Sequence, residues 1–249
     1  MHRLLSLPTV CALSVAALGG CAAENGDEGI FITSNIAASD TCSFSASGSE
    51  PFLSHGTFSV HSRLGYRLHP LMKSRVTATT TQTDARTVIV EGARVTLTFP
   101  DEGVLGAAQQ DALRNSGIMR FTSLFSAPLT PNGGLATGEF DLITPALLDE
   151  LIAAKGNGIL AVDAPSFRAE LVATVVVYGD MAGSEITSQE FQYPVTICND
   201  CIVNELGACP LPMGTLLTNT GNACNPYQDG NVDCCRMGAD VVCPATVAP

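Results

Sequence analysis

The cysteines of this 249-residue chain are unevenly distributed, and their distribution constrains the fold more than any other feature. Seven of them fall in the last 52 residues: Cys198, Cys201, Cys209, Cys224, Cys234, Cys235 and Cys243. This density of about 13 % exceeds the roughly 8 to 10 % that is typical of a disulfide scaffold. The same segment has few large apolar residues besides Leu206, Leu211, Leu216 and Leu217. We therefore expect disulfides to replace a hydrophobic core in residues 198–249, the C-terminal segment.

The N-terminus indicates that the chain is exported to an oxidising compartment. Arg3 is followed by an apolar run over residues 4–18 and then by the small residues "GGCAA". This order is typical of a signal peptide. An uncleaved membrane anchor is the less favoured alternative, because Pro8, Gly19 and Gly20 disfavour a spanning helix. Disulfides form and persist after such export.

The end of the apolar run, Leu18-Gly19-Gly20-Cys21, resembles the lipobox of bacterial lipoprotein precursors. The resemblance implies that residues 1–20 are removed and that Cys21 is lipidated and becomes the first mature residue. Several acyl chains would then hold the protein on the membrane, since each buried CH₂ contributes about 0.8 kcal/mol. Ala22 stands after Cys21 where Asp would imply the inner membrane, so the outer membrane is expected. The alternative is a plain secretory signal cut near Ala22 or Ala23, which would give a secreted protein.

The number of remaining cysteines predicts a link between two distant parts of the chain. Once Cys11 is removed and Cys21 is lipidated, Cys42 and the seven cysteines of the C-terminal segment remain. An even set in an exported protein predicts four disulfides, with roughly a hundred formal pairings left open. Seven cysteines cannot all pair among themselves, so one is expected to reach Cys42. The start of the folded domain and the C-terminal segment should therefore be neighbours.

Charge and composition exclude some classes of partner. The precursor has 12 Lys+Arg against 24 Asp+Glu, and its net charge of −12 becomes −13 when Arg3 is lost. So acidic a protein is not expected to bind nucleic acid or anionic lipid through charge. The expected partners are the membrane, through the lipid anchor, and an envelope protein or polysaccharide. With 46 % hydrophobic and 14 % charged residues, the composition favours a β-rich domain.

Alternation of apolar and polar residues predicts strands along the middle of the chain. The clearest alternating stretches are residues 56–69, 86–99, 166–179 and 190–197, and shorter strands are expected at 118–125 and 138–143. Glu91 and Gly92 interrupt the alternation of their stretch, which predicts a β-bulge. Pro194 predicts an edge position, because proline cannot donate to the next strand.

One segment is expected to be helical. Residues 144–156 place Thr144 as N-cap, Pro145 at the first helical position and Gly156 at the end, with an apolar stripe of Leu147, Leu148, Leu151 and Ile152. A weaker helix is expected at 104–114.

These elements predict a mainly β fold. We expect an antiparallel immunoglobulin-like or fibronectin-like sandwich over residues 41–197, after a flexible acidic tether at 21–40. The lipobox, "GARVTL" and "EFQYPVTICNDCIV" together resemble uncharacterised exported bacterial lipoproteins that join such a sandwich to a cysteine-rich end. The resemblance implies architecture and no activity.

The stretch "CNPYQDGNVDCC", residues 224–235, can be compared with a calcium loop. With Asn225 at position 1, Asp229, Gly230 and Asp233 fall at positions 5, 6 and 9, but Arg236 falls where a bidentate Glu is needed. The favoured interpretation is a turn at Asp229 and Gly230 between two disulfide-tied segments.

The pair in "CNDC", Cys198 and Cys201, has the spacing of a thiol-redox motif. Such motifs depend on a helix N-terminus that lowers the pKa of the attacking thiol, and no apolar helical pattern follows this pair. Structural disulfides are therefore favoured. Zinc bound by Cys198, Cys201, Cys209 and another thiolate is disfavoured in an oxidising compartment.

The remaining residue types suggest no catalytic centre. His55, His61 and His69 are expected to face solvent or to end strands, and "HExxH", "GxSxG" and a phosphate-binding glycine loop are absent. We expect no metal, no cofactor and a non-catalytic binding, adhesion or scaffolding role. The alternative is an envelope enzyme, either a thiol-disulfide oxidoreductase using Cys198 and Cys201 or a hydrolase whose residues are distant in sequence.

Overall fold

The structure is a computed structural model that describes residues 28–62, 64–79, 81, 83–153, 167–199 and 201–248. The predicted signal peptide, Cys21 and the predicted helix end at Gly156 lie outside the described residues. Within the described ranges the chain is mainly β, which confirms the predicted class. No helix in these ranges is long and apolar enough to cross a membrane.

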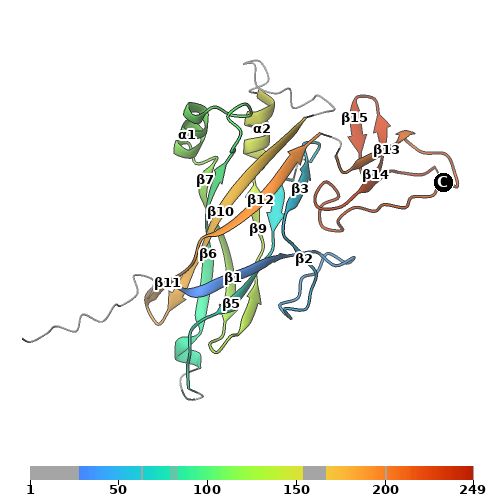
Figure 1. Cartoon of the computed structure of the whole chain (residues 1–249). Helices are drawn as coiled ribbons and strands as arrows, with labels where there is room; N and C mark the ends of the chain where they lie inside the picture. The colour runs from blue at the N-terminus through green and yellow to red at the C-terminus, as the bar shows by residue number, and fades with distance from the viewer. Residues whose placement is uncertain are drawn as a thin grey trace, which may run out of the picture.

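Most strands of residues 28–197, the β domain, belong to one large sheet (Figure 1). The order along the sheet is β3 (Gly56–Ser59), β12 (Phe191–Cys198), β10 (Arg168–Met181), β11 (Ser184–Ser188), β1 (Glu28–Ile36), β5 (Pro70–Ser74) and β8 (Leu135–Thr137). On the same sheet, β6 (Val88–Thr98) pairs with β10 and β7 (Arg120–Leu129), and β2 (Phe52–Leu53) pairs with β1. A separate pair consists of β4 (Tyr66–Leu68) and β9 (Phe140–Ile143). The fold therefore has several groups of strands around one core.

The pairing is not purely antiparallel, which corrects the expected antiparallel sandwich. β1 runs parallel to β11 and β3 runs parallel to β12. The long strand β10 connects the two parts of the sheet, because it pairs with β12 over residues 168–175 and with β11 over residues 178–181. One edge of β10 pairs with two strands in succession, β12 and then β11. The sheet therefore continues from this edge as two separate branches.

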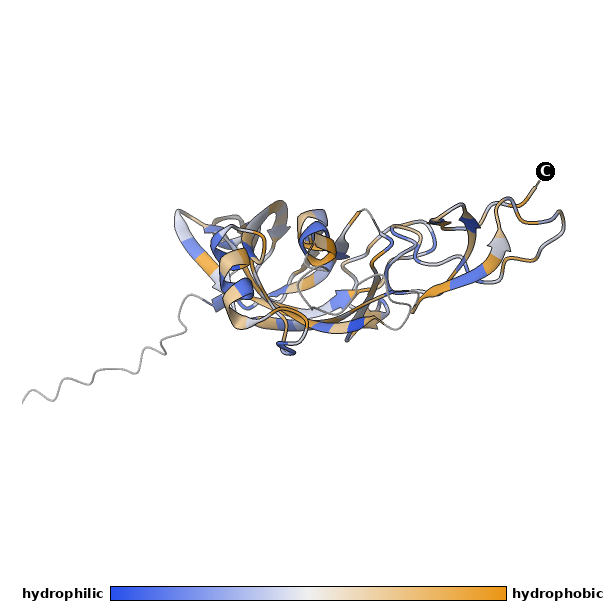
Figure 2. Ribbon diagram, turned by 90° about the horizontal axis from the view of Figure 1, so that it is seen from above, coloured by the Kyte–Doolittle hydropathy of each residue, from blue (hydrophilic) through white to orange (hydrophobic). Residues whose placement is uncertain are grey.

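Alternation of side chains explains the central strands. On β10 the residues from Ala169 to Val177 alternate between buried and half-buried or exposed positions, and Figure 2 shows the corresponding alternation of apolar and polar colour along the strands. The predicted bulge is confirmed, since Val90 and Gly92 pair with consecutive residues of β10 and leave Glu91 as the extra residue. Pro194 lies one residue before β12 begins to pair with β3, so only this end of the strand is an edge.

The prediction of one strand over residues 56–69 is wrong. The chain turns after β3 and returns as β4, which pairs with a different strand. Gly65 explains the break, because its φ of +76° is a conformation that favours glycine and a Cβ there would meet the Ile143 carbonyl oxygen at 2.2 Å. Alternation continued across the turn and concealed it.

The predicted tether over residues 21–40 is wrong for residues 28–36. These residues form β1, which lies between β11 and β5 in the sheet. Its alternation buries Ile30 and Ile32 and leaves Phe31 exposed, so the strand pattern was present directly after the acidic stretch. The β domain begins at least thirteen residues before the predicted boundary at residue 41.

Both predicted helices are present, as α1 (Ala107–Asn115) and α2 (Pro145–Ala153). Thr144 caps α2, with the Leu147 backbone N–H donating to its hydroxyl at 3.4 Å. Leu147, Leu148 and Leu151 are buried as expected, whereas Ile152 is 49 % exposed. The outer side of α2 therefore keeps an apolar residue at the surface.

The C-terminal segment projects from one end of the β domain (Figures 1 and 2). Its small sheet has the order β13 (Val203–Ala208), β14 (Val232–Met237) and β15 (Asp240–Val242). The buried cluster of this segment, among the described residues, consists of Leu211, Cys235 and Ala245. So small a cluster agrees with the expectation that covalent links replace a core.

Candidate functional site

The eight expected cysteines form four disulfides. The pairs are Cys42 with Cys224, Cys198 with Cys201, Cys209 with Cys235, and Cys234 with Cys243. The predicted link to Cys42 is confirmed, and it closes a sequence separation of 182 residues. The last two pairs tie both faces of β14 to the rest of the segment. Because Cys198, Cys201 and Cys209 belong to two different disulfides, they do not form a common thiolate site.

The "CNDC" pair lies at the end of a strand. Cys198 is the last residue of β12 and is buried, while Cys201 is exposed. The next element is strand β13 and not a helix. The pair therefore lacks the helix N-terminus that activates the attacking thiol in redox motifs.

The loop over residues 224–230 docks on the β domain through its amide and carboxyl side chains. Gln228 acts like a strand partner of Arg67: its amide accepts from the Arg67 N–H at 3.0 Å and donates to the Arg67 carbonyl at 2.8 Å. Asn225 donates to the Gly65 carbonyl at 2.8 Å. Asp229 accepts from the Thr57 N–H at 2.8 Å. These bonds satisfy backbone groups of β3, of β4 and of the turn between them.

A chain of buried hydrogen bonds continues from Asp229 into the β domain. The Tyr66 hydroxyl donates to Asp229 Oδ2 at 2.8 Å, so its oxygen accepts from the Tyr193 hydroxyl at 2.9 Å. The Tyr193 oxygen in turn accepts from Asn35 Nδ2 at 2.9 Å, and Asn35 Oδ1 accepts from the His69 N–H at 2.8 Å. Each hydroxyl proton in this series of hydrogen bonds therefore has one acceptor. The chain joins β1, β12 and β4 to the C-terminal segment.

Burial shifts the pKa values of the side chains in this chain of hydrogen bonds. It raises the pKa of the Asp229 carboxyl to about 6, although hydrogen bonds from Thr57 and Tyr66 act in the opposite direction. Burial likewise raises the pKa of Tyr193 to about 12 and that of Tyr66 well above its ordinary value. The two phenols are therefore protonated at neutral pH and can donate toward Asp229. The sequence predicted the turn at Asp229 and Gly230 but not the role of this carboxylate.

The other candidate calcium ligand, Asp233, has a different set of donors. It accepts from the Asn219 and Asn204 amides at 2.9 and 2.8 Å and from two backbone N–H groups. The hydrogen bonds from Asn219 and Asn204 hold the pKa of Asp233 well below its ordinary value. Asp229 and Asp233 therefore serve separate networks. In the part of the chain that the structure describes, no group of three or more His, Cys, Asp or Glu could hold a metal ion.

His69 ends a strand, which is one of the two expected positions for the histidines, but it does not face solvent. This residue follows β4 and is only 3 % exposed, with its ring stacked on Phe44 at a centroid distance of 3.5 Å. Burial, and then the charge of Arg67, lower the pKa of His69 to about 4. The strand-end position was expected, but the cover by Phe44 depends on a loop distant in sequence.

His55 lies in the arrangement that most resembles a catalytic cluster. Its Nε2 lies 3.2 Å from Glu170 Oε2 and 3.0 Å from Thr196 Oγ1, and Thr196 donates to Glu170 at 2.6 Å. A triad requires one ring nitrogen for the nucleophile and the other for the acid. Here both partners use Nε2, and Thr196 is fully buried. Burial raises the pKa of Glu170, but the bonds from Thr196 and His55 outweigh it and the pKa is lowered.

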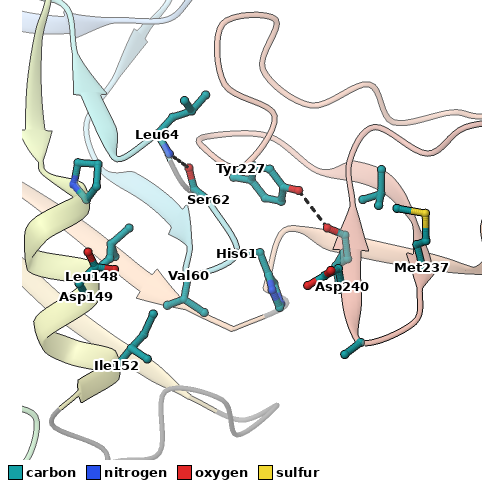
Figure 3. Close-up of a pocket in the computed structure, with 14 residues that line it drawn as sticks. Val60, His61, Ser62, Leu64, Leu148, Asp149, Ile152, Tyr227, Met237 and Asp240 are labelled. Carbon is teal, nitrogen blue, oxygen red and sulfur yellow. Dashed lines mark hydrogen bonds between the residues drawn. The ribbon is translucent and has the colours of Figure 1, made fainter.

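An open cavity, the junction cleft, lies between α2 and the β14–β15 hairpin. It has a volume of about 800 Å³, and its floor is the turn between β3 and β4 (Figure 3). Leu148 and Ile152 form the wall on the α2 side, and Tyr227 and β15 form the opposite wall. The cleft is built by two regions whose relative position depends on the Asp229 chain and on the Cys42 disulfide.

The lining of the junction cleft combines exposed apolar side chains with carboxylates. Leu64, Ile152 and Met237 are 54 %, 49 % and 61 % exposed. Asp149 and Asp240 stand on opposite walls (Figure 3), and neither forms an ion pair with a described residue. The cleft can therefore hold an apolar group and a cation together. Sequence reasoning missed it, although the exposed end of the α2 stripe at Ile152 was a signal.

Comparisons with known proteins add no relative. No protein-family model matches the chain, and no curated protein matches it significantly.

Proposed function

We propose that this protein is a lipid-anchored protein of the cell envelope, attached through Cys21, with a non-catalytic binding, adhesion or scaffolding role. We place its binding surface at the junction cleft. The observation that carries the proposal is that a disulfide and a buried hydrogen-bond chain hold two regions together around this cleft. A preformed concave surface with apolar walls and a few polar groups is typical of a binding site.

The position of the first described residues supports presentation away from the membrane. Glu28 begins β1 at the end of the β domain opposite the C-terminal segment (Figure 1). Only six residues separate it from Cys21. A lipid at Cys21 would therefore hold that end near the bilayer and leave the cleft facing outward from the outer membrane.

The immunoglobulin-like or fibronectin-like layering also belongs to this proposal. Strands from both parts of the sheet bury side chains in one continuous core, among them Ile30, Leu97 and Val195. Such a frame keeps its shape while surface loops and attached segments recognise partners, although the fold alone does not name the partner.

Attachment is tested by Cys21→Ala and membrane fractionation. We expect the variant to move from the membrane fraction to the soluble fraction, because the lipid provides the attachment. An unchanged distribution would exclude lipidation as the cause of membrane association.

Partner binding is tested by photo-crosslinking in the native envelope. A photoreactive amino acid at Ile152, in the cleft, should yield a discrete crosslinked species. The matched control is Leu124 on β7, which is 78 % exposed and lies outside the cleft. Equal crosslinking at both positions, or none at Ile152, would contradict a binding role for the cleft. Alkylation of the native protein tests the redox alternative, which requires a readily reducible Cys198–Cys201 pair.

A further inference from the structure

The strand that lines the junction cleft has an outer edge that faces into it. β15 is the terminal strand of its sheet, next to β14. The two strands are joined by Gly238 and Ala239, and the positive φ of Gly238, +68°, is typical of a two-residue hairpin turn. A terminal strand presents unpaired backbone groups to a partner.

The register of the hairpin shows which groups point outward. Met237 pairs with Asp240 beside the turn, and Arg236 pairs with Val241. In an antiparallel ladder hydrogen-bonded and non-bonded pairs alternate, and the pair that closes a two-residue turn is bonded. The backbone N–H and carbonyl of Val241 therefore point away from β14. The Tyr227 hydroxyl confirms this direction, because it donates to the Val241 carbonyl at 3.2 Å from the cleft side. An added strand would therefore use the outward N–H of Val241 and would replace the Tyr227 hydroxyl at the carbonyl.

We propose that β15 binds an extended peptide segment of a partner protein, added as a further strand in the junction cleft, with a Lys or Arg side chain between apolar ones. This inference deepens the proposed function and rests on it. Peptide addition to a sheet edge uses backbone hydrogen bonds for affinity and pockets for alternate side chains for specificity. The edge of β15 provides the backbone groups, and the cleft of about 800 Å³ provides space for side chains.

Charge complementarity selects the partner. The carboxylates of Asp149 and Asp240 are exposed on opposite walls of the cleft, and no Lys or Arg is found among the described residues that line it. A cationic side chain at the centre of the peptide would lie between two walls that each carry a carboxylate. An acidic peptide would meet two like charges, which disfavours binding.

The apolar walls select the flanking residues. Alternate side chains of an extended peptide lie on one face about 6 to 7 Å apart. Ile152 and Met237 are exposed on the two walls, so they can contact the apolar residues on either side of the cation. Contact with a partner would remove these side chains from water.

The direct test uses a heptapeptide in which threonine and valine alternate around a central lysine, with blocked ends, and the complete mature protein. Binding is followed by NMR chemical shifts of the protein backbone. We expect the amides of β15 and of α2 to shift with the lysine peptide. The same peptide with glutamate at its centre should bind at least about tenfold more weakly.

Four variants separate the contribution of the strand edge from that of the carboxylate side chains. Val241→Pro removes the outward N–H and should weaken the lysine peptide about tenfold, whereas Val241→Thr keeps this N–H and should bind normally. Asp149→Asn and Asp240→Asn should each weaken it roughly two- to fivefold. The matched control is Glu102→Gln, an exposed carboxylate outside the cleft. Near-ultraviolet circular dichroism establishes that each variant is folded.

The outcomes are distinguishable. Equal binding of the lysine and glutamate peptides, or full binding by Val241→Pro, would overturn the proposal. A dimer in sedimentation that Val241→Pro dissociates would show that a second copy occupies the edge, which also overturns it. If neither peptide shifts β15 while crosslinking at Ile152 is retained, the peptide partner is wrong and the proposed function stands. If crosslinking at Ile152 is also lost, both the peptide partner and the proposed binding role of the cleft are wrong.

Discussion

The β domain and the C-terminal segment are stabilised by different means. The β domain buries a continuous set of large side chains that includes Phe58, Leu97, Phe99 and Tyr193. Among the described residues of the C-terminal segment, the buried cluster consists of Leu211, Cys235 and Ala245, and Ile202, Val232 and Cys234 are buried outside it. Three of the four disulfides lie wholly in the segment from Cys198 onward. The comparison teaches that covalent links concentrate where apolar side chains are too few to order the chain.

The largest expected effect comes from breaking the disulfides. Reduction of all four should disorder the C-terminal segment and leave the β domain folded, because each bridge contributes about 2 to 4 kcal/mol in a region without a large core. Hydrogen exchange read by mass spectrometry should show loss of protection in β14 and retained protection in β6 and β10. Loss of protection in all three strands at once would contradict the proposed difference between the regions.

A truncation in the core of the β domain should have the next largest effect. Leu97 is fully buried on the central strand β6, so Leu97→Ala should lower the free energy of unfolding by about 2 to 5 kcal/mol. The matched control is Leu216→Ala in the C-terminal segment, where the side chain is 79 % exposed, with an expected change within about 0.5 kcal/mol. Denaturant titration measures both. Similar losses at the two positions would mean that the segment has an apolar core of its own.

The link between the regions should respond to one hydroxyl group. Tyr66→Phe removes the hydroxyl that joins Asp229 to Tyr193, and should cost about 1 to 3 kcal/mol because buried polar partners are left unsatisfied. The matched control is Tyr178→Phe, which keeps the ring that Arg94 contacts at 4.6 Å and should change stability little. Denaturation and crosslinking at Ile152 should both detect the loss in Tyr66→Phe. A stability equal to that of the control would show that the chain of hydrogen bonds does not hold the regions together.

The smallest expected effect is the pH dependence of the intact protein between about pH 4.5 and 6. The folded pKa of Asp229 is raised from 3.8 to about 6, so its contribution falls as pH rises through this range. The folded pKa of His69 is lowered from 6.5 to about 4, so its contribution rises with pH through the same range. The two effects have opposite signs. The free energy of unfolding should therefore change little.

Single variants should separate these two contributions. Asp229→Asn removes the contribution that falls with pH and keeps that of His69, so its stability should rise from pH 4.5 to pH 6. His69→Gln leaves only Asp229, and its stability should fall over the same interval. Denaturant titrations at pH 4.5, 5.0, 5.5 and 6.0 measure the slopes. Parallel slopes in both variants and in the unmodified protein would show that neither group titrates as described.

Much of the fold could be predicted because its information is local. Alternation located β6, β10 and β12, the interruption at Glu91 and Gly92 located the bulge, and capping residues located α2. Local reasoning failed where a pattern continued through a turn at Gly65 or began inside an acidic stretch at β1. In both places strand pairing overrode what the neighbouring residues suggested.

The candidate site was less predictable. The odd number of cysteines in the C-terminal segment predicted the link to Cys42, but not that Cys224 is the partner. Asp229, Ile152 and Val241 come from three separate stretches of sequence, and no spacing rule relates them. Only packing of the C-terminal segment on the β domain brings them to one junction.

The sequence by itself determined that the chain is mainly β and that its end depends on disulfides, because composition and periodicity act residue by residue. The parallel strand pairs, the burial of His69, the chain of hydrogen bonds at Asp229 and the junction cleft were decided only by the tertiary structure. The parallel pairs, the chain of hydrogen bonds and the cleft depend on groups more than a hundred residues apart, and the burial of His69 depends on Phe44 in a separate loop. Such contacts form only when the whole chain has packed.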